Sequence, residues 1–156
     1  IQSALLLFKL KKFKKNLKQK NININYFTTE LKKLKEFEVL HFDKKHNFKT
    51  GYFYGFKLSD FFLKKNNKKN FIFECNKMNI NIQKELYKPV YLTPEFGWKN
   101  SPIKVNYKNT KCKVAENILP KKVVWINFIY FLGNQKFIDD ILKSFKIVFK
   151  KLDDFN

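Results

Sequence analysis

The clearest hydrophobic pattern lies at the C-terminal end of the chain. Between residues 133 and 154, large apolar residues recur every three or four positions, which is the spacing of one face of an α-helix. They are Phe137, Ile141, Phe145, Val148 and Leu152, with Ile138, Leu142 and Phe149 widening the same face. Asn134 is placed to act as N-cap, and Asp139 and Asp140 lie near the positive end of the helix dipole. The pattern predicts an amphipathic helix that packs on the core.

The N-terminal end has a narrower apolar stripe surrounded by lysine. Its members are Leu6, Leu10, Phe13 and Leu17, and their spacing predicts a basic helical arm over residues 1–20. Such a segment suits a targeting peptide, a membrane-surface helix or an arm that contacts a polyanion. Import peptides are rich in Arg and Ser, whereas this segment has no Arg and one Ser. The polyanion is therefore favoured, and a membrane-surface helix stays open.

Between these ends the chain predicts several strands, a helix and polar connections. Residues 21–27 (NININYF) predict a strand or extended connector. Thr28, Thr29 and Glu30 then cap a predicted helix that ends before Asp43. Residues 48–58 (FKTGYFYGFKL) contain two glycines among aromatic residues, which predicts a strand with a bulge or a close backbone approach.

The second half of the chain predicts further strands and two polar connections. Residues 71–75 and 78–82 form one expected hairpin, residues 103–107 and 112–118 a second, and residues 123–132 a buried strand. Residues 64–70 (KKNNKKN) predict a charged turn, and the Pro-rich residues 88–102 a long loop. The predicted fold is α+β. It has a basic arm at 1–20 and a single domain at 21–156, with a mixed or antiparallel sheet and a C-terminal amphipathic helix.

Charge adds a statement about partners. The 156 residues carry a formal net charge of +20, and every basic residue is lysine. A charge of this size favours a polyanionic partner such as nucleic acid. Lysine, Asn, Phe and Ile together make up more than half of the chain, and their codons can be written with A and T alone. Codon bias therefore accounts for part of the positive charge, so the net charge is weaker support for a polyanionic partner than its size alone suggests.

This composition, with a first residue other than Met, resembles proteins encoded by protist mitochondrial genomes, those of ciliates above all. The resemblance implies location in the mitochondrial matrix, where respiratory-complex subunits and ribosomal proteins are made. No window holds the 18 apolar residues of a transmembrane segment, which disfavours an integral subunit. We therefore expect a structural protein of the mitochondrial ribosome that binds rRNA and neighbouring ribosomal proteins. A soluble matrix-facing subunit of a respiratory complex or ATP synthase is the alternative, and a general single-strand-binding module is a third possibility.

Candidate RNA-binding residues combine lysine runs with aromatic side chains that can stack on bases. The segment TGYFYGF resembles the aromatic strand of RRM domains at Gly51, Tyr52 and Tyr54, but departs from it at Thr50 and Phe53. The full candidate set is Lys9, Lys11, Lys12, Lys14, Lys15, Lys18, Tyr52, Tyr54, Lys64, Lys65, Lys68, Lys69, Trp98, Lys99, Lys121 and Lys122. Because lysine binds phosphate as a point charge, we expect recognition of charge and shape without sequence preference.

Signals for catalysis and metal binding are weak. His41, Asp43 and His46 include metal-ligating residue types, but no Cys-x-x-Cys pair accompanies them. Cys75 and Cys112 are too few and too far apart for a disulfide framework, so both are expected to be reduced and buried. The chain has no nucleophile elbow and no glycine-rich phosphate loop. We therefore expect no enzymatic activity, metal, cofactor or small-molecule substrate.

Overall fold

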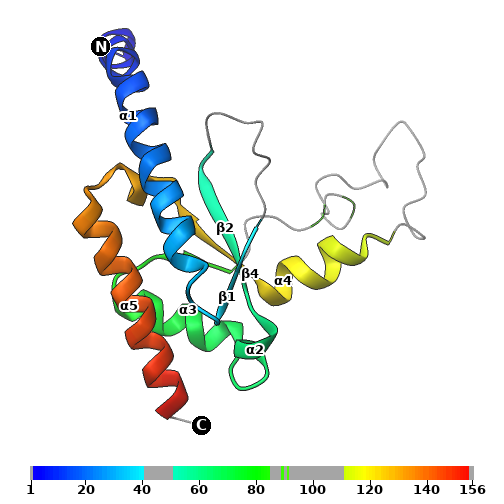
Figure 1. The fold of residues 1–156 in the computed structure, drawn as a ribbon. Coiled ribbons are helices and arrows are strands. Elements are labelled where there is room, and N and C mark those ends of the chain that lie inside the picture. Colours follow the sequence, from blue (N-terminus) through cyan, green and yellow to red (C-terminus); the bar gives the residue numbers. More distant parts are fainter. Residues whose placement is uncertain (1, 41–50, 85–88, 90, 92–110, 155–156) are drawn as a thin grey trace, which may run out of the picture.

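The computed structural model describes residues 2–40, 51–84, 89, 91 and 111–154. A long N-terminal helix, α1 (Gln2–Leu31), rises beyond the rest of the molecule, and the C-terminal helix α5 (Gln135–Asp154) lies against its lower half (Figure 1). The strands are β1 (Phe37–Val39), β2 (Phe53–Leu58), β3 (Ile82–Gln83) and β4 (Val123–Asn127). The remaining helices are α2 (Asp60–Leu63), α3 (Lys68–Lys77), the π-helix η4 (Val114–Ile118), α4 (Leu119–Lys122) and the 3-10 helix η5 (Phe128–Leu132).

The described strands form one antiparallel sheet in the order β1-β2-β4-β3. Gly55 on β2 lies opposite Trp125 on β4. A Cβ at Gly55 would come within 2.6 Å of the Trp125 ring, so the strand needs glycine there to let the indole lie across it. This agrees with the close backbone approach predicted for residues 48–58.

One face of the sheet is covered by α1, α3 and α5, and aromatic rings fill the space between the layers. Phe27 of α1 contacts Tyr54 and Phe56 of β2, with ring centroids 5.6 and 6.3 Å apart. It also contacts Phe131 at 5.2 Å and Phe145 at 6.3 Å. All five side chains are fully buried. The pairs of Phe27 with Tyr54, Phe56 and Phe131 meet edge to face, a geometry that stabilises a core beyond the buried area alone.

The C-terminal helix confirms the strongest pattern in the sequence. Asn134 caps it, since its Oδ1 accepts a hydrogen bond from the backbone N–H of Phe137 at 2.9 Å. The side chains it buries are Ile138, Ile141, Leu142, Phe145, Val148, Phe149 and Leu152. Phe137 is the exception, because it is 42% exposed and stacks on Tyr130 of η5.

The strand or connector predicted at 21–27 is wrong, and so is the helix predicted to start at Thr28. Helix α1 runs through this region without a break and ends at Leu31. Ile24, Phe27 and Leu31 share its buried face, so tertiary packing overrides the local alternation. Leu34 and Phe37 lie after the helix, and Phe37 begins β1.

Several strand predictions in the second half are also wrong. Residues 71–75 lie inside α3, and within 78–82 only Ile82 belongs to a strand. Residues 114–118 form η4 and not a strand. The run 123–132 is a strand only as far as Asn127, whose side chain caps η5 by accepting from the N–H of Ile129 at 2.8 Å.

Other predictions lie partly or wholly outside the described residues. These are the Pro-rich loop at 88–102 apart from residues 89 and 91, the strand at 103–107, and the candidate metal ligands His41, Asp43 and His46. The α+β prediction is confirmed, while the domain boundary at residue 20 stays a prediction. Among the described helices, none combines the length and the hydropathy of a membrane-spanning segment.

Candidate anion-binding site

A pocket of about 670 Å³ lies where the turn before α3 meets α4 and the residue that follows β3. Among the described residues, its lining has five lysines, two asparagines and no carboxylate: Leu63, Asn66, Asn67, Lys68, Lys69, Lys84, Pro120, Lys121 and Lys122. We call it the lysine pocket. Such a lining favours an anionic ligand.

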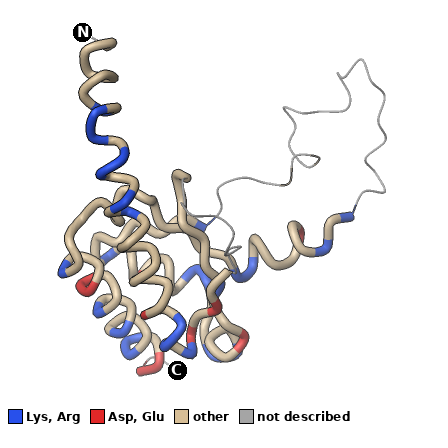
Figure 2. The backbone as a smooth tube through the Cα atoms, turned by 45° about the horizontal axis from the view of Figure 1, so that its top comes forward, with Lys and Arg blue, Asp and Glu red and all other residues tan. Residues whose placement is uncertain are grey.

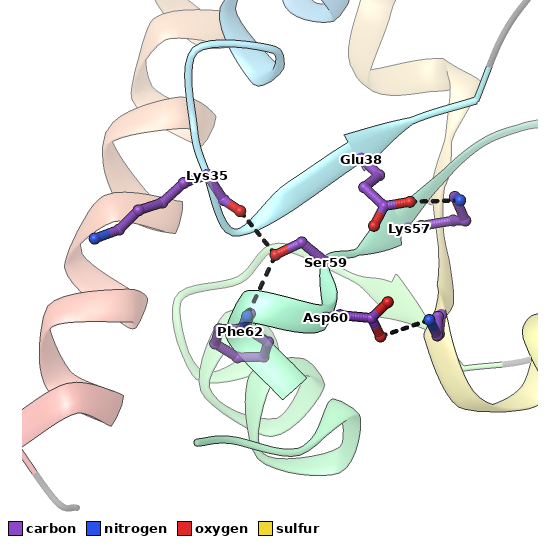
Figure 3. A network of polar contacts seen from close by, with 7 residues as sticks. Lys35, Glu38, Lys57, Ser59, Asp60 and Phe62 are labelled. Atoms are coloured by element: carbon purple, nitrogen blue, oxygen red, sulfur yellow. Dashed lines mark hydrogen bonds and ion pairs between the residues drawn. The ribbon is translucent and has the colours of Figure 1, made fainter. Parts of the chain in front are cut away.

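The wall of the lysine pocket includes residues of α2 and α3, and an N-cap side chain fixes the start of each of these helices. Ser59 directly follows β2 and caps α2, because its Oγ accepts from the N–H of Phe62 at 3.3 Å. The same Oγ donates to the carbonyl of Lys35 at 2.7 Å (Figure 3). Asn67 caps α3, with Oδ1 accepting from the N–H of Asn70 at 2.9 Å. The N-terminus of α3, the positive end of its dipole, therefore opens at the lysine pocket.

Lys68 fixes the inner side of the pocket. Its side chain is buried, and Nζ donates to the carbonyls of Lys84 at 2.7 Å, Pro120 at 3.0 Å and Leu119 at 3.3 Å. A buried ammonium needs such acceptors, because an unsatisfied charge is very costly to remove from water. Lys68 thus ties α3 to α4 and to the end of β3.

The other lysines of the pocket differ in how far their charge is balanced. Nζ of Lys122 lies 2.6 Å from Oδ1 of Asp60, and this hydrogen bond lowers the pKa of the Asp60 carboxyl. Lys69, Lys84 and Lys121 are exposed, and among the described residues no carboxylate forms an ion pair with them. These three ammonium groups supply most of the positive charge that a ligand would meet.

The structure brings together part of the predicted residue set. Lys68 and Lys69 meet Lys121 and Lys122 in the lysine pocket, although about fifty residues separate the two runs. Lys64 and Lys65 are exposed but lie outside the lining. The remaining predicted lysines of the described chain, Lys9, Lys11, Lys12, Lys14, Lys15 and Lys18, are exposed on α1. Trp98 and Lys99 lie outside the described residues.

Two members of the set cannot act as predicted. Tyr54 is fully buried, its hydroxyl lies 2.8 Å from Oγ1 of Thr28, and burial raises its pKa. It therefore belongs to the core and cannot stack on a base, whereas Tyr52 is 86% exposed. Lys68 is the second, because its ammonium already donates to three carbonyls.

Sequence reasoning missed Lys84, Asn66 and Asn67. Lys84 is a single lysine after a two-residue strand, and no local pattern distinguishes it from its neighbours. The asparagines stood in the segment predicted as a charged turn, and Asn67, four residues before the apolar run that begins at Phe71, was the available N-cap signal for α3.

Other reactive side chains occupy separate places. Cys75 is buried, which raises the pKa of its thiol, whereas Cys112 is exposed, contrary to prediction.

Glu116 accepts from the hydroxyl of Tyr91 and from the N–H of Cys112, and the first bond raises the pKa of Tyr91 to about 12. Within the described ranges, no group of three His, Cys, Asp or Glu residues could hold a metal ion.

An anion pocket beside a helix N-terminus is typical of proteins that bind phosphorylated small molecules. Residues 1–144 of the 156 match the DegT/DnrJ/EryC1/StrS aminotransferase family. The chain belongs to this family. A search of curated proteins gives no match.

Family membership corrects several expectations. The family is not one of ribosomal proteins, so assignment to the mitochondrial ribosome is wrong, and the alternative of a respiratory-complex or ATP synthase subunit is not supported either. The family consists of aminotransferases, which contradicts the prediction of no enzymatic activity. It also implies small-molecule substrates, where rRNA and ribosomal proteins were expected as the partners.

The family implies pyridoxal phosphate as cofactor, and the lysine pocket fits only part of it. Enzymes that use this cofactor need a lysine amine for the imine and a partner for the ring nitrogen, such as an Asp carboxylate. The buried lysine of the pocket, Lys68, has its Nζ occupied by three carbonyls, and the described part of the lining holds no carboxylate and no aromatic ring. Lysines and a helix N-terminus suit the phosphate group alone, so the described residues do not form a complete cofactor site.

Proposed function

We propose that this aminotransferase-family chain binds a phosphate-bearing small molecule in the lysine pocket. The observation that carries the proposal is the convergence of Lys69, Lys84 and Lys121 on one cavity, with no carboxylate among the lining residues that the structure describes. In this proposal the three ammonium groups contact the phosphate oxygens, and the N-terminus of α3 adds its dipole.

The rigid parts of the pocket support this assignment. Lys68 holds α4 against α3 through backbone carbonyls, and Asp60 restrains Lys122. A site whose walls are fixed before binding loses less conformational freedom when the ligand arrives. The role proposed for the chain is to bind and orient the anionic end of a substrate, and we assign no step of amino transfer to these residues.

Titration calorimetry of the full chain with pyrophosphate tests the proposal. The double variant Lys69→Gln, Lys121→Gln removes two charges from the pocket. We expect its affinity to fall about tenfold per lysine, since a hydrogen bond to a charged group contributes about 1.5–3 kcal/mol. Wild-type affinity should also fall as salt rises, because exposed charges are screened.

A matched control is Lys146→Gln, Lys150→Gln, which removes two exposed lysines from α5. Both double variants lower the net charge equally, so a contribution from the overall positive field would affect them alike. The proposal requires the α5 variant to stay within about twofold of wild type. Equal losses in the two variants would show that pyrophosphate binds to diffuse charge and not to the pocket.

We also propose, from the composition of the chain, that the protein is located in the mitochondrial matrix. Subcellular fractionation with an antibody to the chain tests it, and recovery outside the mitochondrial fraction would refute it.

A further inference from the structure

The exposed half of α1 continues the face that the other half buries. Leu6, Leu10 and Phe13 are 59%, 58% and 53% exposed, and Leu17 is half-buried. We call these four residues the arm stripe. The same three-and-four spacing, with Lys20 at one position, continues into the fully buried Ile24, Phe27 and Leu31. The arm stripe is thus an extension of the core face that no described part of the chain covers.

A hollow lies at the foot of the arm stripe. It has a volume of about 620 Å³, and Phe13 and Leu17 line it together with Tyr52 and Leu132 from the other side. Lys9, Asn16, Lys20 and Gly51 complete the lining. Tyr52 and Leu132 are 86% and 46% exposed. An apolar stripe that leads into a hollow with its own apolar wall is a groove of the kind that takes one face of a helix.

The charged residues around the arm stripe indicate what charge a helix bound there should carry. Lys9 and Lys14 flank it directly, and residues 2–20 contain no acidic residue. In the tube view, lysine positions recur along α1 below its first turns, and no Asp or Glu position is seen in this part of the helix (Figure 2). The same positions in a coiled coil select partners of opposite charge. A second copy of the arm would bring like charges together and is disfavoured.

We propose that the arm stripe and the hollow bind an acidic amphipathic helix of another protein. Its apolar residues cover the stripe and fill the hollow, and its carboxylates meet Lys9 and Lys14. The site is separate from the lysine pocket, so it adds a protein partner to the small-molecule ligand proposed above.

The probe for this proposal is a synthetic helical peptide with Leu at the contact positions and Glu on both flanks, titrated against the full chain by fluorescence anisotropy. Phe13→Ala should weaken binding about tenfold or more, because a central aromatic anchor is lost. Leu132→Ala should weaken peptide binding about threefold or more, because it removes part of the apolar wall of the hollow. Ile129→Ala is the matched control, since Ile129 lies in the same 3-10 helix, is 67% exposed and is outside the hollow. This control should leave binding unchanged.

Two further measurements separate the groove from simple charge attraction. A peptide with Ser in place of every Leu but the same Glu residues should bind at least tenfold more weakly, and comparable binding would overturn the proposal. Equal effects of Leu132→Ala and Ile129→Ala would also overturn it. Analytical ultracentrifugation of the chain alone provides the last test: dimerisation that Phe13→Ala abolishes would make a second copy the occupant, again against the proposal.

Discussion

The two halves of α1 have the same hydrophobic spacing but different surroundings. From Leu17 toward the N-terminus the stripe faces solvent, whereas Ile24, Phe27 and Leu31 are fully buried, and α1 contacts η5, α5 and β1. The spacing of apolar residues therefore shows which face of the helix is used, and the elements opposite that face decide whether it contributes to folding.

Polar residues distinguish the halves as well. Asn23 in the buried half donates from Nδ2 to the carbonyls of Phe131 and Gly133, both at 2.8 Å. In the exposed half, Lys12 lies over the ring of Phe8 at 4.3 Å. Among the described residues, no ion pair involves a lysine of this half. The buried half is held by specific contacts, and the exposed half mainly displays charge and apolar surface.

The largest expected effect comes from Phe27→Ala. The ring contacts four aromatic residues from β2, η5 and α5, and its removal leaves a cavity between the layers. Truncation of a buried Phe costs about 3–5 kcal/mol of unfolding free energy. Urea denaturation should show this as a lower midpoint with little change in slope. A loss below about 1 kcal/mol would mean that the core collapses around the site or that α1 is only loosely docked.

The second-largest effect on stability is expected from Asn23→Ala. This substitution leaves the carbonyls of Phe131 and Gly133 without their donor at the junction of η5 and α5. An unsatisfied buried acceptor costs about 1–3 kcal/mol. Asn16→Ala, in the exposed half, is the matched control and should change the unfolding free energy by less than about 0.5 kcal/mol. Equal effects would show that Asn23 contributes helix propensity alone.

An element is predicted correctly from sequence where its local hydrophobic pattern and its packing in the fold favour the same secondary structure. Helix α5 has eight apolar residues at helical spacing and an N-cap, and only Phe137 departs from the prediction. Residues 21–27 show the opposite case, because Asn and Ile alternate like a strand while Ile24, Phe27 and Leu31 continue a helical face. Over such a short stretch, the apolar residues fit both the two-residue period of a strand and the 3.6-residue period of a helix. Contacts with η5 and α5 favour the helix.

The candidate site is less predictable from sequence. The runs at 68–69 and 121–122 were identified as basic, but only the fold brings them to one cavity and adds Lys84. Nothing local shows that Lys68 is buried and binds carbonyls while Lys69 is exposed. Family membership, which overturned the ribosomal hypothesis, rests on similarity along most of the chain, and no single motif identified from the residues pointed to it.

A smaller effect is expected on the pH dependence of stability. Glu74 of α3 accepts from Lys151 of α5 and from Lys77, and these bonds lower its carboxyl pKa. A lowered folded-state pKa adds stability that is present above the unfolded value, about 4.3, and is lost as pH falls through the folded value. Glu74→Gln should therefore lower the melting temperature at pH 7 and flatten its decline below pH 5. Lys15→Gln, on the exposed half of α1, should leave the shape of that curve unchanged, and a flattened curve for this variant as well would assign the acid sensitivity to overall charge.

The smallest effect on stability is expected from Phe13→Ala. Its ring is 53% exposed, and Phe13 lies eleven residues before the fully buried Ile24, so truncation removes little area from the folded core. The unfolding free energy should change by less than about 0.5 kcal/mol in the isolated chain, against the several kcal/mol expected for Phe27→Ala. The same variant is expected to lose most of its affinity for the acidic helical peptide, and this combination of unchanged stability and lost binding is the signature of a docking residue. A loss of stability above about 1 kcal/mol without the peptide would show that Phe13 is covered by the chain itself, and the contrast between the two halves of α1 would then disappear.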